Sequence, residues 1–245
     1  MRQLIVPFIL VLAVIALLIH GPIVQDQAYH AFVDQRSFFG IPNFFNVITN
    51  LPFLFVGMWG IHRSRRRSEG SARHIAFMLF IGFVLLTFGS GFYHWKPNDF
   101  TLLFDRLAIA VIFMSLFSLV IHDFIGKGIG QRLLPPLLMI GIGSVLWWYG
   151  ADDLRPYALV QFFPVVAMPL MMLLYRSTFN YWREFGWIYL FFILAKLTEE
   201  LDLEIFEFFQ QKFSGHSFKH LFMAAAGMMI VALFKRRSSS PEDPK

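Results

Sequence analysis

The chain contains no cysteine, and this absence removes several kinds of site at once. Disulfide bonds, thiolate metal sites and cysteine nucleophiles are all excluded. Charged residues are also scarce: they make up 15% of the 245 residues, whereas 57% are hydrophobic. A soluble domain of this length usually carries more charge and fewer long apolar runs. Any metal must therefore be held by histidine nitrogen or carboxylate oxygen, in a chain that we expect to lie in a membrane.

Several apolar stretches approach or exceed the roughly 20 residues that a helix needs to cross a bilayer. The sequence predicts an all-α integral membrane protein, a seven-span helical bundle with an additional N-terminal apolar helix. The spans of the bundle are expected at about residues 42–61, 75–93, 133–149, 157–175, 185–197 and 216–234, with one more starting near residue 101.

The first apolar run, at residues 4–19, could be a signal peptide or a retained helix. It is followed by His20-Gly21-Pro22-Ile23 and not by the small-residue motif at which signal peptides are cleaved, which favours a retained helix. We therefore expect three parts. These are an N-terminal membrane helix or uncleaved signal anchor at 1–22, a seven-span domain at 23–234 and a cytoplasmic polar tail at 235–245.

The connections between the expected spans alternate in charge. The basic connections lie at residues 62–74, 127–132, 176–183 and 235–237. The other connections are acidic or mixed. Because basic loops stay on the cytoplasmic side, both ends of the chain are predicted to be cytoplasmic. Topology alone accounts for the net charge of +5, so the sequence does not indicate a nucleic-acid partner.

Five polar residues gather at the non-cytoplasmic ends of three expected spans. Ser90 and His94 lie at i and i+4, so they share one helix face. Asp105 begins the next span, and His216 and His220, again at i and i+4, begin the last one. The topology was assigned from the loops alone, yet it places all five at one depth. Polar groups at membrane depth are costly and are read as functional by default.

These residues match the requirements of a catalytic metal site. Histidines at i and i+4 chelate a first-row metal, and His94 completes a three-histidine set with an open fourth position, as in catalytic zinc sites. Zinc lowers the pKa of a bound water to about 7. Asp105 could carry the proton of that water, and Ser90 could donate to a developing oxyanion. The competing interpretation of His216 and His220 is a pair of interfacial histidines.

Three asparagines, Asn43, Asn46 and Asn50, follow the face of one expected helix. Two interpretations stay open for them. They can be polar contacts between helices, which hold membrane bundles together. They can also line the mouth of a pocket.

Lys219 lies between the two late histidines and is expected to be structural. Glu200 and Asp202 are its candidate partners across the mouth of the bundle. Lys196 and Glu200 lie at i and i+4, which also fits a pair within one helix.

The Ser-x-x-x-His of Ser90 and His94, with Asp105 eleven residues later and the late His-x-x-x-His, resembles the alkaline ceramidase family. That family belongs to a wider group of seven-span membrane hydrolases and receptors that includes the adiponectin receptors. The Asn-rich segment 43–50 resembles the entry to the family's first core helix, and the resemblance covers about residues 28–234. It implies Zn²⁺ on the three histidines, Asp105 and Ser90 beside the metal water, and hydrolysis of the ceramide amide to a sphingoid base and a fatty acid.

The N-terminal part departs from the family. The apolar segment before Ala28 lies outside the seven-span core. Some family members bind Ca²⁺ with several acidic residues in the connector that follows. Here Asp34 and, less directly, Asp26 could serve, with Asn43 as a neutral oxygen ligand. By this resemblance, Asp34 and Asn43 are the candidate ligands of a calcium site.

The expected partner is a membrane lipid, ceramide or a similar N-acyl lipid, that enters from the outer leaflet. A hydrolase of a related N-acyl or ester lipid is a second possibility. A third is a non-enzymatic seven-span receptor or sensor with a structural zinc, in which Asp105 closes the site as a fourth ligand. A transporter is disfavoured because the sequence shows no inverted repeat and no paired broken helices.

Overall fold

The computed structural model describes residues 2–67, 70–177 and 180–237. These residues form helices and loops without a strand, apart from an isolated bridge between Phe38 and Ile41. The elements are α1 (Arg2–His20), η1 (Gln27–His30), α2 (Phe44–Ile48), α3 (Leu51–Arg67), α4 (Gly70–Trp95), α5 (Asp99–Phe124), α6 (Lys127–Ala151), α7 (Arg155–Leu174), α8 (Trp182–Glu200), α9 (Asp202–Phe208) and α10 (Gly215–Arg237).

Six stretches among the described residues are long and apolar enough to cross a membrane. They lie at residues 44–66, 72–95, 99–124, 127–151, 155–174 and 215–234. A multi-pass helical protein is therefore consistent with the structure. The seventh expected span forms as α8, but Arg183, Glu184, Lys196, Glu199 and Glu200 keep it below the hydropathy of the other six. The seventh crossing and the crossing by α1 stay predictions.

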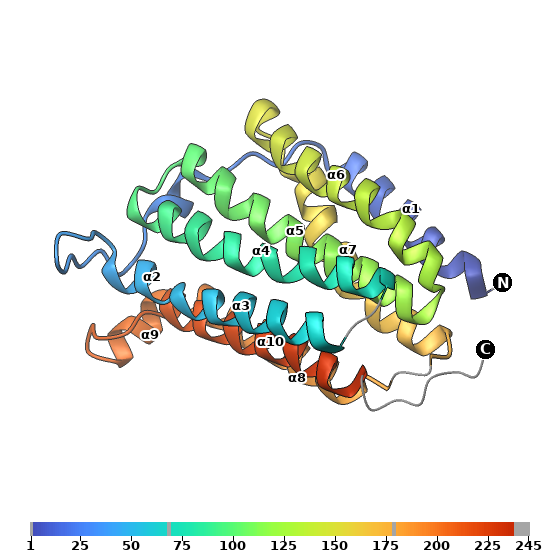
Figure 1. Cartoon of the computed structure of the whole chain (residues 1–245). Coiled ribbons are helices and arrows are strands. Elements are labelled where there is room, and N and C mark those ends of the chain that lie inside the picture. The colour runs from blue at the N-terminus through green and yellow to red at the C-terminus, as the bar shows by residue number, and fades with distance from the viewer. Residues whose placement is uncertain (1, 68–69, 178–179, 238–245) are drawn as a thin grey trace.

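Helix α5 is the centre of the bundle, with 78% of its most apolar stretch buried. It packs between α4 and α6, while α10 packs against α8 and α3 (Figure 1). Glycine brings α4 close to α5. A Cβ at Gly82 would lie 2.7 Å from Ile112 Cγ1, and one at Gly89 would lie 2.6 Å from Phe104 O. The spacing of these two helices thus depends on residues without side chains.

The two ends of the bundle carry different elements. The start of α1 and the end of α10 lie toward the same end of the bundle, and η1, α2 and α9 lie at the other (Figure 1). Helix α10 extends to Arg237, three residues into the expected tail, and the remainder of that tail, 238–245, lies outside the described residues.

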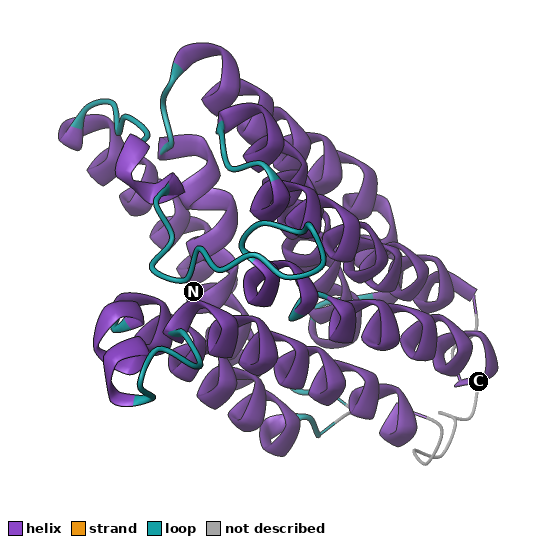
Figure 2. Ribbon diagram, turned by 90° about the vertical axis from the view of Figure 1, so that its left-hand side faces the viewer, coloured by secondary structure: helices purple, strands orange, loops and turns teal. Residues whose placement is uncertain are grey.

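The connector from residue 21 to residue 43, which includes η1, crosses the end of the bundle where α2 and α9 lie (Figure 2). The turn between α6 and α7 holds it in place. Asp152 Oδ1 accepts from Gln25 N at 3.1 Å, and Asp153 Oδ1 accepts from Ile23 N at 3.3 Å. Leu154 N in turn donates to Ile23 O at 2.8 Å. The first residues after α1 are therefore fixed over the cavity described below.

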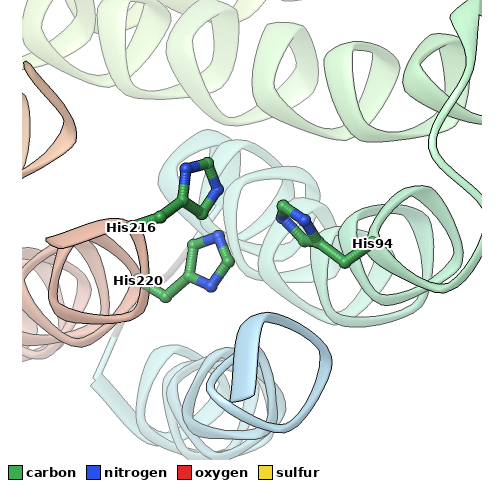
Figure 3. A group of neighbouring side chains, drawn as sticks. All are labelled: His94, His216 and His220. Atoms are coloured by element: carbon green, nitrogen blue, oxygen red, sulfur yellow. The ribbon is translucent and has the colours of Figure 1, made fainter. Parts of the chain in front are cut away.

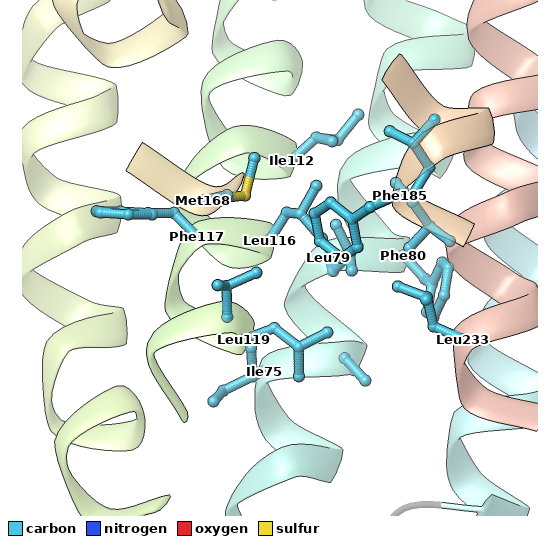
Figure 4. Packing of buried hydrophobic residues seen from close by; sticks show 14 of the residues in the cluster. Ile75, Leu79, Phe80, Ile112, Leu116, Phe117, Leu119, Met168, Phe185 and Leu233 are labelled. Carbon is cyan, nitrogen blue, oxygen red and sulfur yellow. The ribbon is translucent and has the colours of Figure 1, made fainter. Parts of the chain in front are cut away.

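The half of the bundle towards the chain ends is packed with apolar side chains. Ile75, Leu79 and Phe80 of α4 are fully buried and meet Leu119 of α5 and Leu233 of α10 (Figure 4). Dispersion contacts of this kind are individually weak and collectively large. This core holds α4, α5 and α10 together, and those helices carry the site residues at their other ends.

Candidate metal centre

Three histidines from two helices converge at the connector end of the bundle. His94 comes from the last turn of α4, and His216 and His220 come from the first turns of α10. Their side chains point toward one another (Figure 3), and all three are buried, with 2%, 6% and 3% exposed. Each offers a ring nitrogen, and these atoms lie within 4.8 Å of one another. The predicted histidine group is confirmed as one that could hold a metal ion, whose identity the geometry leaves open.

The start of α10 is fixed by close contacts with the preceding segment. A Cβ at Gly215 would collide with the carbonyl oxygen of Thr198, so only glycine fits there. Asp202 Oδ1 accepts from the His216 N–H at 2.8 Å and satisfies one of the free N–H groups at the helix start. Burial raises the pKa of the Asp202 carboxyl, although this hydrogen bond acts in the opposite direction. These contacts set the position of His216 relative to α8 and α9.

The ring nitrogens of the histidines fit a metal. Thr49 Oγ1 donates to Phe45 O at 2.7 Å and can accept from His220 Nδ1 at 2.9 Å, which leaves Nε2 of His220 free to ligate. Nδ1 of His94 is buried and has no hydrogen-bond partner among the described residues. A buried ring nitrogen without a partner is costly, and a bound cation would satisfy it. Three neutral imidazoles also suit zinc.

Phe32 covers one side of the histidine group. Its ring centroid lies 4.6 Å from that of His94 and 5.0 Å from that of His216. Asn43 donates to the backbone oxygen of His94 at 2.8 Å and ties the end of α4 to the entry of α2. The connector thus supplies both an apolar cover and a polar anchor for the site.

Asp105 and Ser90 lie beside the histidines. Both line one cavity of about 300 Å³ together with His94 and His220. The Ser90 hydroxyl interacts with the Asp105 carboxylate, since Gly89 allows α4 and α5 to approach closely at this level. Asp105 does not belong to the group of metal-ligand atoms among the described residues. The structure therefore brings all five predicted residues to one place, where three histidines form a group that could hold a metal ion and Ser90 and Asp105 lie beside it.

The cavity continues in two directions. Phe53, Leu86, Ile109 and Met223 line both this cavity and a narrower one of about 70 Å³ with apolar walls, which runs between the helices. On the other side, a more open depression of about 650 Å³ shares Lys196 with the main cavity. The site is thus flanked by an apolar cavity between the helices and by a depression beside α8.

Lys219 has a partner that sequence reasoning did not choose. Its Nζ donates to Glu199 Oε1 at 2.6 Å, and Lys196 Nζ donates to the other oxygen of Glu199 at 2.8 Å. The expected pairs with Glu200 and Asp202 are wrong, because Glu199 is the residue of α8 that faces α10. Lys219 Nζ also lies 3.4 Å from His216 Nε2, so its charge sits at the edge of the site.

The three asparagines act as contacts between segments. Asn46 is fully buried, and its Oδ1 accepts from Ser217 Oγ at 3.1 Å. Asn50 donates to Asn46 O at 2.7 Å. Neither they nor Asn43 is among the residues that line the cavity. The structure therefore favours the packing interpretation over the pocket-mouth interpretation.

The expected calcium ligands have other partners. Asp34 is buried and binds Arg36 through two hydrogen bonds of 2.8 and 2.7 Å, and this contact raises the pKa of Arg36. Asp26 caps η1 by accepting from Ala28 N at 2.9 Å. Among the described residues, the histidines are the one group of three or more ligating side chains, and Asp34 lies outside it. Calcium at Asp34 and Asn43 stays a prediction.

Sequence reasoning gave no role to Arg106. Its guanidinium lies 3.9 Å above the Trp148 ring, and its Nη2 donates to Gln25 Oε1 at 2.6 Å. It lines the same cavity as Asp105. The available signal was a basic residue directly after Asp105, in the first turns of an apolar span.

Comparison with known protein families found no match, and comparison with curated proteins found none either. The likeness to alkaline ceramidases therefore rests on the five site residues, their spacing and the Asn-rich segment, and membership of that family stays a prediction. The structure shows a helical chain with several candidate membrane spans and a buried histidine group that could bind a metal ion.

Proposed function

We propose that the chain is a zinc-dependent membrane hydrolase that cleaves the amide bond of an N-acyl lipid, with ceramide as the expected substrate. The observation that carries the proposal is that a buried three-histidine group, which could hold a metal ion, lies against one cavity: His94 and His220 line it together with a carboxylate and a hydroxyl. Metal ligands alone would support many functions. A metal, a proton carrier and a hydrogen-bond donor in one half-enclosed cavity are the parts that hydrolysis requires.

Each residue has a distinct task in this proposal. Zinc bound to the histidines would supply a nucleophilic water near neutral pH and polarise the amide carbonyl. Asp105 takes a proton from the attacking water and delivers it to the departing nitrogen. Ser90, beside that carboxylate, donates to the carbonyl oxygen as it becomes negative. One water is consumed, the C–N bond breaks, and a fatty acid and an amine leave.

The shape of the cavity supports a lipid substrate. The apolar extension that shares Phe53, Leu86 and Ile109 with the main cavity suits an acyl chain. The depression next to Lys196 suits lateral entry from the bilayer. A related N-acyl or ester lipid would use the same features. Ceramide is therefore the expected substrate, and N-acyl lipids are the substrate class.

The rival function is a receptor whose zinc is purely structural. A structural zinc usually has four protein ligands, whereas a catalytic zinc keeps one position open. The ligand group of the described residues has three members, and Asp105 is not one of them. This count supports the enzyme over the receptor.

Asp105→Asn separates the two. If Asp105 handles protons, the variant keeps its zinc and its melting temperature and loses about 10²- to 10⁴-fold in turnover. If Asp105 is a ligand, the same change lowers zinc content and thermal stability together. Ser90→Ala is the companion variant, expected to slow turnover at unchanged zinc content. The proposal is abandoned if Asp105→Asn hydrolyses N-acyl lipids at the wild-type rate.

We further propose that the site faces the non-cytoplasmic side, with both termini in the cytoplasm. The support is the distribution of basic residues between alternate connections. Because the chain has no cysteine, one introduced thiol is a unique label. Gly150→Cys and Lys127→Cys lie at opposite ends of α6, and both positions are exposed. An impermeant maleimide should label Gly150→Cys in intact cells and Lys127→Cys only after permeabilisation; the reverse result inverts the topology.

A further inference from the structure

The cavity beside the histidines carries more positive than negative side chains. Arg106, Lys196 and Lys219 line it as cations, and Asp105 and Glu199 line it as carboxylates. Both lysines bind the same carboxylate, with Nζ to oxygen distances of 2.8 and 2.6 Å to Glu199. One carboxylate therefore serves two ammonium groups, and a divalent cation on the histidines would add further positive charge.

Arg106 is the cation least compensated by protein groups. It is 7% exposed, and its guanidinium donates a hydrogen bond to a neutral partner, Gln25 Oε1. Nη1 is buried without a hydrogen-bond partner, and the ion pairs found in the described part of the chain include none to Arg106. The rings of Trp148 and Tyr157, with centroids 3.9 and 5.2 Å from the guanidinium carbon, hold it in place.

The physical consequence is a demand for a negative ligand. Aromatic rings attract a cation but do not neutralise it, and a buried charge without an opposite partner is strongly unfavourable. A guanidinium with a free N–H matches the planar oxygens of a carboxylate and the oxygens of a phosphate. A neutral headgroup such as that of ceramide would leave Arg106 with the Coulomb attraction of Asp105 and with no ion pair among the described residues.

We propose that the lipid bound in this cavity carries an anionic group, a carboxylate or a phosphate, close to its amide, and that Arg106 binds this group. Lys196, with 47% of its side chain exposed and lining both the cavity and the outer depression, attracts the same charge during entry. Arg106 is thereby a specificity-determining residue. The proposal rests on the hydrolysis proposed above and replaces neutral ceramide, the substrate that the resemblance implies, with an anionic N-acyl lipid as the preferred substrate.

The test compares lipids that differ only in charge. Purified full-length protein in detergent micelles is given N-dodecanoylglycine, N-dodecanoylethanolamine and the phosphate ester of the latter. We expect kcat/KM to be at least about tenfold higher for one anionic lipid than for the neutral one, as for a hydrogen bond between charged groups. The two anionic arms tell a carboxylate from a phosphate. Equal kcat/KM for all three overturns the inference and leaves the amidase intact.

Arg106→Gln should abolish this preference, mainly through a raised KM for the anionic lipid, so that kcat/KM no longer differs between the anionic and the neutral lipid. Lys127→Gln, the same loss of charge at the far end of α6, is the matched control and should change neither value. A full preference retained in folded Arg106→Gln overturns the assignment. If that variant does not fold, Lys196→Gln, at an exposed position, is the second test. The preference for the anionic lipid should fall about two- to fivefold in this variant and should depend on salt. An unchanged preference contradicts the inference.

If no lipid is hydrolysed, the amidase proposal fails, and binding still tests the charge. The three lipids are then titrated into wild-type protein, and the Kd of each is measured by the change in intrinsic tryptophan fluorescence, since Trp148 lies against Arg106. A Kd about tenfold lower for an anionic lipid supports the inference. Equal affinities overturn it.

Discussion

The two halves of the bundle use the same helices for opposite purposes. Towards the chain ends, α4 buries Ile75, Leu79 and Phe80 in an apolar core. About four turns further along, the same helix buries Ser90 and His94, and their neighbours are polar. Buried polar groups cost free energy unless they are fully paired, so the second half is not arranged for stability. Substitutions in the apolar half should therefore lower stability, whereas substitutions in the polar half should lower metal binding and activity.

The largest effect should come from removing ligands. In a His216→Ala, His220→Ala double variant, zinc content should fall below about a tenth per chain and hydrolysis should disappear, because one imidazole cannot hold a catalytic zinc. Metal analysis of the purified variant by mass spectrometry measures this. His74→Ala, an exposed histidine at the opposite end of α4, is the control and should keep both zinc and turnover. Full zinc occupancy in the double variant contradicts the site.

A substitution that leaves a cavity in the apolar half should lower stability and leave zinc binding unchanged. Leu79 is fully buried, so Leu79→Ala should destabilise the protein by about 2–5 kcal/mol, while zinc content per folded chain stays at the wild-type value. Denaturant-induced unfolding in mixed micelles gives the change. Leu85→Ala on the same helix, where the side chain is 49% exposed, should cost far less. Equal effects of the two changes would mean that α4 is not packed as described.

Adding one methyl group at Gly89 should disrupt the close approach of α4 to α5. A Cβ at Gly89 would meet Phe104 O and push Ser90 away from Asp105, and a displacement of about 1 Å can cost about 10²-fold in turnover. Gly89→Ala should therefore keep zinc and lose most activity. Gly91→Ala adds the same methyl group two residues later, where no atom lies within 4 Å, and should be neutral. Comparable kinetics for the two variants would refute this role of Gly89.

The smallest effect concerns the turn that holds the connector over the cavity. Arg155 binds the Asp153 carboxylate at 2.7 Å and, through this hydrogen bond, lowers its pKa further than burial raises it. A carboxyl whose folded pKa lies below the unfolded value, about 3.9, stabilises the fold fully above that pH and loses this contribution as the pH falls through the folded pKa. The melting-temperature advantage of wild type over Asp153→Asn should be complete at pH 6–7 and shrink in acid. A constant difference down to pH 3 would contradict the ion pair.

Most of the site was predictable because helical geometry is regular. The i, i+4 spacing placed His216 and His220 on one face, and the count of crossings placed His94 and Asp105 at the same depth. Helix positions followed from apolar runs, although the boundaries moved by several residues. Lys127 rather than a residue near 133 begins α6, for example.

What could not be predicted depends on contacts between distant segments. Nothing in the sequence says that Glu199, and not Glu200, turns toward Lys219, because the rotation of α8 is set by its packing on α10. The pairing of Gln25 with Arg106 joins residues 81 positions apart. Gly89 is one of 17 glycines, and only the helix crossing identifies it as a point of close approach. The periodicity of the sequence indicates on which face of a helix a residue lies, but it does not indicate which residue of another segment it contacts.

The most direct test of the account is metal-dependent hydrolysis by the wild-type protein. Fatty acid released from a panel of N-acyl lipids, ceramide and anionic lipids included, is measured before chelation, after it, and after zinc is added back. Release should stop with the chelator and return in proportion to bound zinc, with full rate at about one zinc per chain. Release that the chelator does not change, or no release from any lipid by protein that holds its zinc, would contradict it.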